Sequence, residues 1–142
     1  MVAKKVFLDT NIVLDIIDKN RLNHMKAKGI WEILIKNHST IMISEDMLST
    51  LFYINKDDSY TLEFFKLIQN RWDIVSFGTT VISNAIELSL EKTLDFEDVL
   101  QCLCAKENGC DVFITNDKKF YNCGIEIMTI EEFLITVSQK RN

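Results

Sequence analysis

The sequence predicts an α/β fold in which a five-stranded, mainly parallel sheet lies between two layers of helices, forming a three-layer α/β/α sandwich. Short continuous apolar runs, such as residues 6–8 and 112–114, are typical of strands that are buried on both faces. Segments between such runs, for example residues 27–35, place apolar side chains at helical spacing. Strands and helices therefore alternate, and about seven helices are expected.

In the first half of the chain, short polar segments separate the apolar runs and mark the helix starts. Ser44 is the expected N-cap of a helix that has Glu45 and Asp46 in its first turn, where acids are favoured. Residues 57–59 indicate a loop and a cap. The expected elements of this half are strands at 6–8, 41–43 and 73–76, and helices at 12–17, 27–37, 45–54 and 60–72.

The second half continues the same alternation. Thr79 or Thr80 is the expected cap of one helix, and Asp95 opens the next. Asn108 and Gly109 end that helix, as glycine commonly does. The expected elements of this half are helices at 81–88, 95–108 and 130–137, and strands at 112–114 and 125–127.

Length and composition indicate one domain covering residues 1–142, because no proline-rich or glycine-rich linker interrupts the chain. No apolar run approaches the length of a membrane span, so we expect a cytoplasmic protein without a membrane partner. The formal net charge of −5 argues against a protein that coats duplex DNA. It is compatible with an enzyme that grips nucleic acid through bound cations, and with a basic protein partner.

The cysteines do not form a recognised zinc pattern, and the chain has only two histidines. We expect all four to be small buried residues in a reducing compartment. They are Cys102, Cys104, Cys110 and Cys123.

Several aspartates stand at the ends of expected strands or the starts of expected helices. Asp9 and Asp117 each follow a buried strand, and Asp95 and Asp98 are three residues apart at a helix start. Ligands bind at the carboxyl ends of strands in open parallel sheets, so these acids are expected to meet there. Carboxylate oxygens suit hard divalent cations, and such ions activate water and stabilise in-line displacement at phosphorus.

Most of these acids also have a purely structural explanation. Asp95 and Asp98 resemble a capping box, and Asp117 suits an ordinary turn. Asp15 and Asp18 fit a solvated helix face, which is the preferred interpretation for Asp18. No cap or turn requirement explains Asp9, which makes it the strongest single candidate.

The ordered set of motifs resembles the PIN-domain family, in its toxin-like branch. Residues 7–15, FLDTNIVLD, are similar to the first family motif, and residues 95–101, DFEDVLQ, to the third. Residues 113–120, FITNDKKF, resemble the closing motif, and residues 43–44 open a helix in the correct order. The resemblance spans about residues 6–130, which is nearly the whole chain.

This resemblance implies strand order 3-2-1-4-5 and a ribonuclease that depends on Mg²⁺ or Mn²⁺. It implies catalytic and metal-binding roles for Asp9, Asp98 and Asp117, with Asp95 as an additional metal-site acid. It also implies RNA as the substrate, an antitoxin protein as a partner, and a homodimer. The supporting polar residues are Thr10, Asn11, Thr50 and Asn116.

One departure from the family pattern leaves a second function open. The second family acid is expected on the helix after Ser44, at the position of Thr50. A threonine hydroxyl is a poor replacement for a carboxylate on a divalent cation, although Asp46 lies one turn earlier on the same face. The alternative is a catalytically weakened or inactive RNA-binding or protein-interaction module. A phosphatase of the haloacid-dehalogenase type is a third option, but it needs a second Asp where the chain has Asn11.

Overall fold

The computed structural model describes residues 3–55 and 58–140, and within them five strands form one sheet in the order β3-β2-β1-β4-β5. Every neighbouring pair of strands is parallel. The predicted strand order and α/β/α class are therefore confirmed, and the sheet is wholly parallel. The strands are β1 (Lys5–Leu8), β2 (Thr40–Ser44), β3 (Asp73–Val75), β4 (Val112–Ile114) and β5 (Glu126–Met128).

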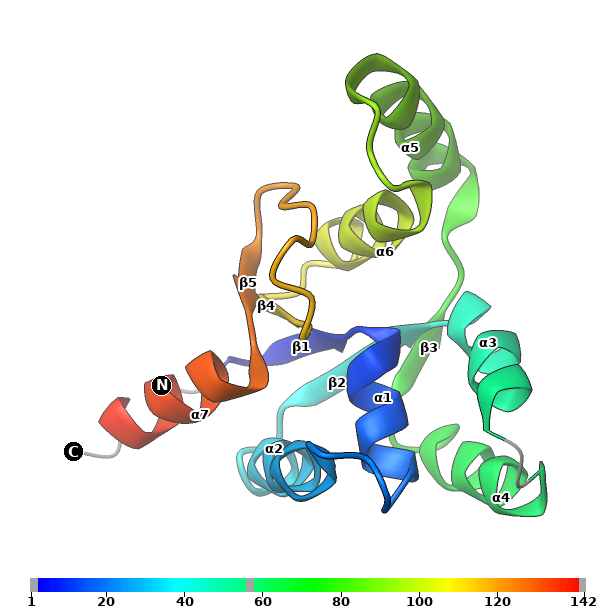
Figure 1. The fold of residues 1–142 in the computed structure, drawn as a ribbon. Coiled ribbons are helices and arrows are strands. Elements are labelled where there is room, and N and C mark those ends of the chain that lie inside the picture. Colours follow the sequence, from blue (N-terminus) through cyan, green and yellow to red (C-terminus); the bar gives the residue numbers. More distant parts are fainter. Residues whose placement is uncertain (1–2, 56–57, 141–142) are drawn as a thin grey trace.

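Seven helices in the described part of the chain cover the two faces of this sheet. Figure 1 shows α5 and α6 on one side, with α5 stacked outside α6, and α1, α2, α4 and α7 on the other side, with α3 beside α1. The helices are α1 (Thr10–Ile17), α2 (His24–Lys36), α3 (Asp46–Ile54), α4 (Asp58–Ile68), α5 (Gly78–Lys92), α6 (Phe96–Glu107) and α7 (Ile130–Lys140).

The register of the sheet aligns the carboxyl ends of β1, β2 and β4. Phe7 of β1 is opposite Met42 of β2 and Phe113 of β4. Backbone pairing continues past the strands, because Asp9 N–H donates to the carbonyl oxygen of Ile114 at 2.9 Å. The first residues after β1 and β4 therefore lie side by side at the carboxyl ends of the strands, where parallel sheets bind their ligands.

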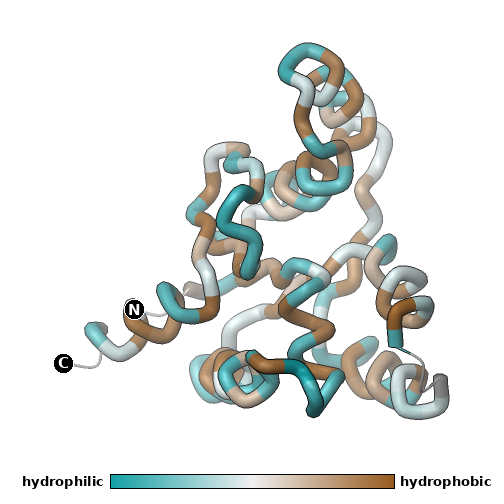
Figure 2. Tube along the Cα trace, in the orientation of Figure 1, coloured by the Kyte–Doolittle hydropathy of each residue, from teal (hydrophilic) through white to brown (hydrophobic). Residues whose placement is uncertain are grey.

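The core lies between the sheet and the helices. The strands β1 and β4 are almost wholly buried, as expected for strands covered on both faces. The rings of Phe7, Phe113 and Phe120 stack in sequence, with centroid distances of 5.1 and 4.5 Å. Figure 2 shows that hydrophobic residues follow the central strands, while hydrophilic stretches occupy many of the outer turns. Among the described residues, no helix is both long and apolar enough to cross a membrane.

Two expected helix caps are wrong. Ser44 belongs to β2, where it pairs with Val75, and its side chain is fully buried, so α3 begins only at Asp46. Gly78 begins α5 with a φ of 78°, which glycine adopts without steric cost, so Thr79 and Thr80 lie inside the helix. The expected caps at residues 57–59 fall partly outside the described residues. In contrast, Asp95 caps α6 as predicted, and Asn108 and Gly109 follow its end.

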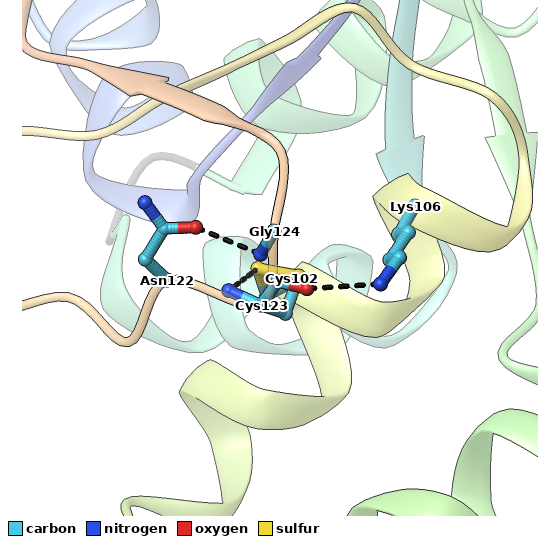
Figure 3. The surroundings of a disulfide bond; sticks show 5 residues. All are labelled: Cys102, Lys106, Asn122, Cys123 and Gly124. Atoms are coloured by element: carbon cyan, nitrogen blue, oxygen red, sulfur yellow. Dashed lines mark hydrogen bonds between the residues drawn. A yellow bond between two sulfur atoms is a disulfide. The ribbon is translucent and has the colours of Figure 1, made fainter.

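The cysteine prediction is also wrong in part. Cys102 of α6 and Cys123, in the segment between β4 and β5, form a disulfide bond, as Figure 3 shows. Cys104 and Cys110 are free and buried, as expected. The pairing depends on the approach of two segments that are 21 residues apart, which the spacing along the chain does not reveal.

Candidate functional site

Asp9 is the first residue after β1 and lies at the centre of the candidate site. One carboxylate oxygen accepts the N–H of Thr10 at 2.8 Å, so Asp9 caps α1 and the prediction that it has no capping role is wrong. The other oxygen accepts the hydroxyl of Thr115 at 2.7 Å and the amide of Asn11 at 3.2 Å. These bonds fix one carboxylate between β1 and β4.

The electrostatics at Asp9 are unusual for an acid with so many donors around it. Burial raises its pKa, and the carboxylate of Asp117 raises it further, while the bonds from Thr115 and Thr10 lower it. The net direction is upward. The surrounding residues therefore leave the negative charge of Asp9 incompletely compensated.

A polar network connects the two strand ends beside Asp9. The backbone N–H of Asn116 donates to the side-chain oxygen of Asn11 at 3.2 Å, and the Asn116 amide donates to Asp15 at 2.8 Å. Asp15 is 3% exposed and also accepts a bond from Arg21 at 2.7 Å. The interpretation of Asp15 as a solvated residue is therefore wrong. The structure brings Asn11 and Asn116 together, and Asp15 accepts a hydrogen bond from the Asn116 side chain.

Asp95 and Asp98 lie at the start of α6, which packs on the side of the sheet opposite to α1. The Asp95 side chain accepts the N–H of Asp98 at 3.1 Å, which is the predicted capping interaction. Partial burial raises the pKa of Asp98 to about 6, and the carboxylates of Asp95, Asp9, Asp117 and Glu97 raise it in that order. The four predicted acids thus share one electrostatic environment.

Asp117 lies on the surface, two residues after Thr115. Its backbone N–H donates to the Thr115 hydroxyl at 3.1 Å, and its carboxylate accepts the N–H of Lys119 at 2.9 Å. This is the turn geometry that the sequence predicts for Asp117. The turn role and proximity to the other acids coexist, because the charge of Asp117 acts on both Asp9 and Asp98.

Two acids that the sequence did not assign to the site also belong to this environment. Partial burial raises the pKa of Glu97, and the carboxylates of Asp46, Asp9 and Asp95 raise it further. Asp46 therefore lies on the side of α3 that faces α6. Thr50 is one turn after Asp46 on α3 and is half-buried. The position of Glu97 between Asp95 and Asp98 was the only sequence signal for it.

The donor set has the chemistry of a site for a hard divalent cation. The donors are carboxylate oxygens. Among the described residues, two ion pairs are formed, by Asp15 and by Glu131, and neither of them includes a predicted metal-site acid. Burial first, and neighbouring carboxylates second, raise the pKa values of Asp9 and Asp98, and a cation would offset both effects by stabilising the ionised forms. In residues 3–55 and 58–140, no three acidic, cysteine or histidine side chains are grouped closely enough to hold an ion as they are placed.

Comparison with known proteins places the chain among relatives of similar length. A curated relative, Ribonuclease VapC1 of Aquifex aeolicus (strain VF5), is 36% identical over 137 residues, which cover 94% of this chain and 95% of the relative. Among solved structures, VapBC2 from Rickettsia felis, bound to a DNA fragment from its promoter, matches with a TM-score of 0.69 at 22% identity. That match covers 88% of this chain and 98% of the other.

A second solved structure supports the same fold. VapC20 of Mycobacterium tuberculosis, described as a toxin that cleaves the sarcin-ricin loop, matches with a TM-score of 0.68 at 16% identity, over 84% of this chain and 95% of the other. The sequence profile of the PIN domain matches residues 6–126. With a profile that spans most of the sequence and a relative 36% identical along nearly all of it, this chain belongs to the PIN domain family.

Proposed function

We propose that this protein is a metal-dependent ribonuclease that hydrolyses phosphodiester bonds in RNA, and that it acts as the toxin of a toxin–antitoxin pair in the cytoplasm. The 36% identical relative is named as a ribonuclease, and PIN ribonucleases generally depend on a divalent metal ion. The observation that carries the proposal is the placement of Asp9, Asp98 and Asp117 in one environment, where burial and the neighbouring carboxylates raise the pKa of Asp9 and Asp98 and a bound cation would offset the negative charges.

In this proposal Asp9, Asp98 and Asp117 hold Mg²⁺ or Mn²⁺, and Asp95 supports Asp98 through the N-cap bond. A divalent ion held there would supply the means to activate water and to stabilise negative charge at the scissile phosphate. Thr115 and Thr10 hold Asp9 in one orientation, so that its carboxylate does not reorganise when the substrate arrives. Asn11 and Asn116 fix the relative positions of the two strand ends.

The proposed partners follow the same reasoning. RNA is the substrate, an antitoxin protein blocks the site, and two copies of the chain form a homodimer. Solved complexes of similar fold include a toxin–antitoxin complex from Klebsiella pneumoniae and a DNA-bound VapBC from Salmonella typhimurium. A chain with a net charge of −5 suits a basic antitoxin segment.

Thr50 supports a second candidate function. If the missing acid has silenced the site, the protein is an RNA-binding or protein-interaction module rather than an enzyme. Asp46 argues for the enzyme, because it places a carboxylate one turn before Thr50 on α3 and its charge acts on Glu97 of α6.

The first experiment measures cleavage of a mixed, structured RNA with Mg²⁺ or Mn²⁺ by the wild type and by Asp9→Asn and Asp98→Asn. We expect cleavage that needs the metal and falls by at least roughly a hundredfold in each variant, since each loses a charged group that acts on the ion. Asp18→Asn, on the far end of α1, is the matched control and should cleave like the wild type.

The outcomes separate the two functions. Equal cleavage by the wild type, Asp9→Asn and Asp98→Asn would reveal a contaminating nuclease. If no preparation cleaves RNA but RNA binding is retained, the protein is the non-catalytic module.

A further inference from the structure

A cavity of about 610 Å³ lies directly beside the candidate site. Asp117 forms part of its wall, so the cavity and the acidic cluster share one residue. The other walls come from the segment after β4, from β5, from the residue before α2 and from the start of α7. None of the proposed steps of phosphodiester hydrolysis uses this cavity.

The lining combines apolar side chains with three amide side chains. Phe120 and Ile127 supply apolar wall, and Phe120 is held in place because its ring stacks on Phe113 at 4.5 Å. Asn23, Asn116 and Asn122 surround this wall. Each amide offers both donors and acceptors, so the lining matches a planar ring with a polar edge better than an aliphatic ligand.

The amides retain unused hydrogen-bonding groups within the described residues. Asn23 makes no side-chain cap bond to α2. Asn122 accepts the N–H of Gly124 at 2.8 Å through its oxygen, and Figure 3 shows its nitrogen directed away from Gly124. Asn116 donates its amide hydrogen to Asp15, which leaves its carbonyl oxygen as an acceptor.

The charges in the cavity select against a phosphate. Asp117, Glu131 and Glu132 line it, with Lys118 as the cation among the lining residues. Glu131 is paired with Lys26, and Glu132 accepts the backbone N–H of Thr129 at 3.0 Å. An excess of carboxylate acceptors favours a neutral ligand that carries its own N–H donors.

We propose that this cavity, the base pocket, binds one nucleobase of the RNA next to the scissile phosphate and favours bases with an exocyclic amino group over uracil. The proposal rests on the ribonuclease function, because Asp117 belongs both to the base pocket and to the acidic cluster that is proposed to cleave the RNA. Proteins read unpaired RNA by packing bases against aromatic or apolar side chains and bonding their edges, which is what this lining offers.

The first test sequences the ends produced from a single-stranded RNA pool of random sequence. We expect wild-type cleavage sites to be depleted in uridine at one fixed position beside the cut. Asn122→Asp keeps the oxygen that accepts the Gly124 N–H but replaces the amide donors, and it should change the base preference at that position by about fivefold, the effect of one hydrogen bond. Asn23→Ala should weaken the preference by a similar factor.

The matched control is Asn84→Ala, an exposed asparagine on α5 on the other side of the sheet, which should keep the wild-type preference. A flat base distribution in the wild type, or the same preference in all three variants, would overturn the base pocket even if cleavage itself is normal.

A second measurement does not depend on cleavage. Adenosine, cytidine or uridine is added to the wild-type chain in chelator, and the side-chain amide resonances of Asn23 and Asn122 are followed by NMR. We expect saturable shifts with adenosine and cytidine and at least roughly threefold weaker binding of uridine. Shifts that are absent, or equal for the three nucleosides, would contradict the proposal. Shifts in a chain that never cleaves RNA would refute the ribonuclease while supporting the base pocket.

Discussion

Asp98 is the acid whose surroundings most oppose its negative charge. Burial raises its pKa to about 6, and four neighbouring carboxylates contribute in the same direction. A folded state that raises the pKa of an acid binds a proton more tightly than the unfolded state does. Without a metal ion, the ionised form of Asp98 therefore destabilises the fold, and its contribution to stability falls as pH rises from about 4 to about 6.

Because ionised Asp98 destabilises the metal-free fold, Asp98→Asn should change the stability in the presence of a chelator. The variant should have a higher free energy of unfolding than the wild type at neutral pH, because it removes a repelled charge. The difference should shrink as pH falls from about 6 toward 4, and it should vanish only below the unfolded-state pKa of 3.8, where Asp98 is protonated in both states. Urea denaturation across this pH range measures the free energy of unfolding of the wild type and of the variant.

The control for that experiment is Glu87→Gln on the exposed side of α5, which should follow the wild-type curve throughout. A variant Asp98→Asn that is less stable than the wild type at neutral pH would show that the acidic cluster is not repulsive as described.

Thr50 decides between the two proposed functions. Thr50→Glu should raise the affinity for Mn²⁺ by at least roughly tenfold, because it adds a carboxylate on the same face of α3 as Asp46. If the wild type is a silenced module, the variant should also gain metal-dependent RNA cleavage. Calorimetry gives the affinity, and the RNA assay gives the activity.

Ser49→Glu provides a comparison with the same charge on the neighbouring, exposed position of α3. Equal Mn²⁺ affinity in the two variants would mean that Thr50 does not face the ion. A wild type that cleaves well and gains little from Thr50→Glu would eliminate the module.

The segment between β4 and β5 is held by several long-range contacts. It carries Asp117, and it is anchored by Phe120 on Phe113 and by the disulfide from Cys123 to α6. Lys106 of α6 also donates to the carbonyl oxygen of Cys123 at 3.1 Å. Since α6 carries Asp98, these anchors connect the two halves of the acidic cluster.

The disulfide has a measurable effect on stability. Replacing both cysteines in Cys102→Ser/Cys123→Ser should lower the free energy of unfolding by about 3 kcal/mol, the value for cross-linking a loop of about 20 residues. Urea denaturation of the oxidised wild type and of the double variant gives the difference.

A thiol reductant is the control, because it should destabilise the wild type and leave the double variant unchanged. Burial raises the pKa of Cys104 to about 11 and that of Cys110 to about 12, so these thiols do not exchange with the disulfide. Equal unfolding midpoints for oxidised wild type and double variant would contradict the expected stabilisation.

The net negative charge of the whole molecule opposes the binding of RNA. The chain has 21 acidic and 16 basic side chains, and acids gather at the strand ends where the scissile phosphate is proposed to lie. Phosphates are repelled by such a surface unless cations intervene. We therefore predict that divalent cations contribute to RNA binding as well as to the proposed chemistry.

Binding of an uncleavable 2′-O-methyl RNA should accordingly be at least roughly tenfold tighter in Mg²⁺ than in chelator. Fluorescence anisotropy measures both affinities, and KCl at matched ionic strength should not replace Mg²⁺. In the double variant Asp9→Asn/Asp98→Asn, affinity in chelator should rise because repulsion is reduced. Equal wild-type affinity with and without Mg²⁺ would show that RNA is held away from the acids.

Much of this architecture could be predicted from local patterns. Apolar runs such as residues 6–8 and 112–114 have few alternatives to a strand buried on both faces, and the capping role of Asp95 needs only its neighbour Asp98. The motif resemblance correctly predicted the strand order and family. The helix starts at Ser44 and Thr79 were wrong, because pairing in the sheet and the conformation of Gly78 override the cap preference.

The sequence by itself determined the fold class, the family and the identity of the predicted acids, because apolar periodicity and short motifs are properties of neighbouring residues. Only the tertiary structure decided which distant groups meet. The burial of Asp15 against Asn116, the addition of Glu97 to the acidic environment, and the bond between Cys102 and Cys123 all arise from segments that are remote along the chain. Their contacts depend on how helices pack across a sheet, which no local pattern encodes.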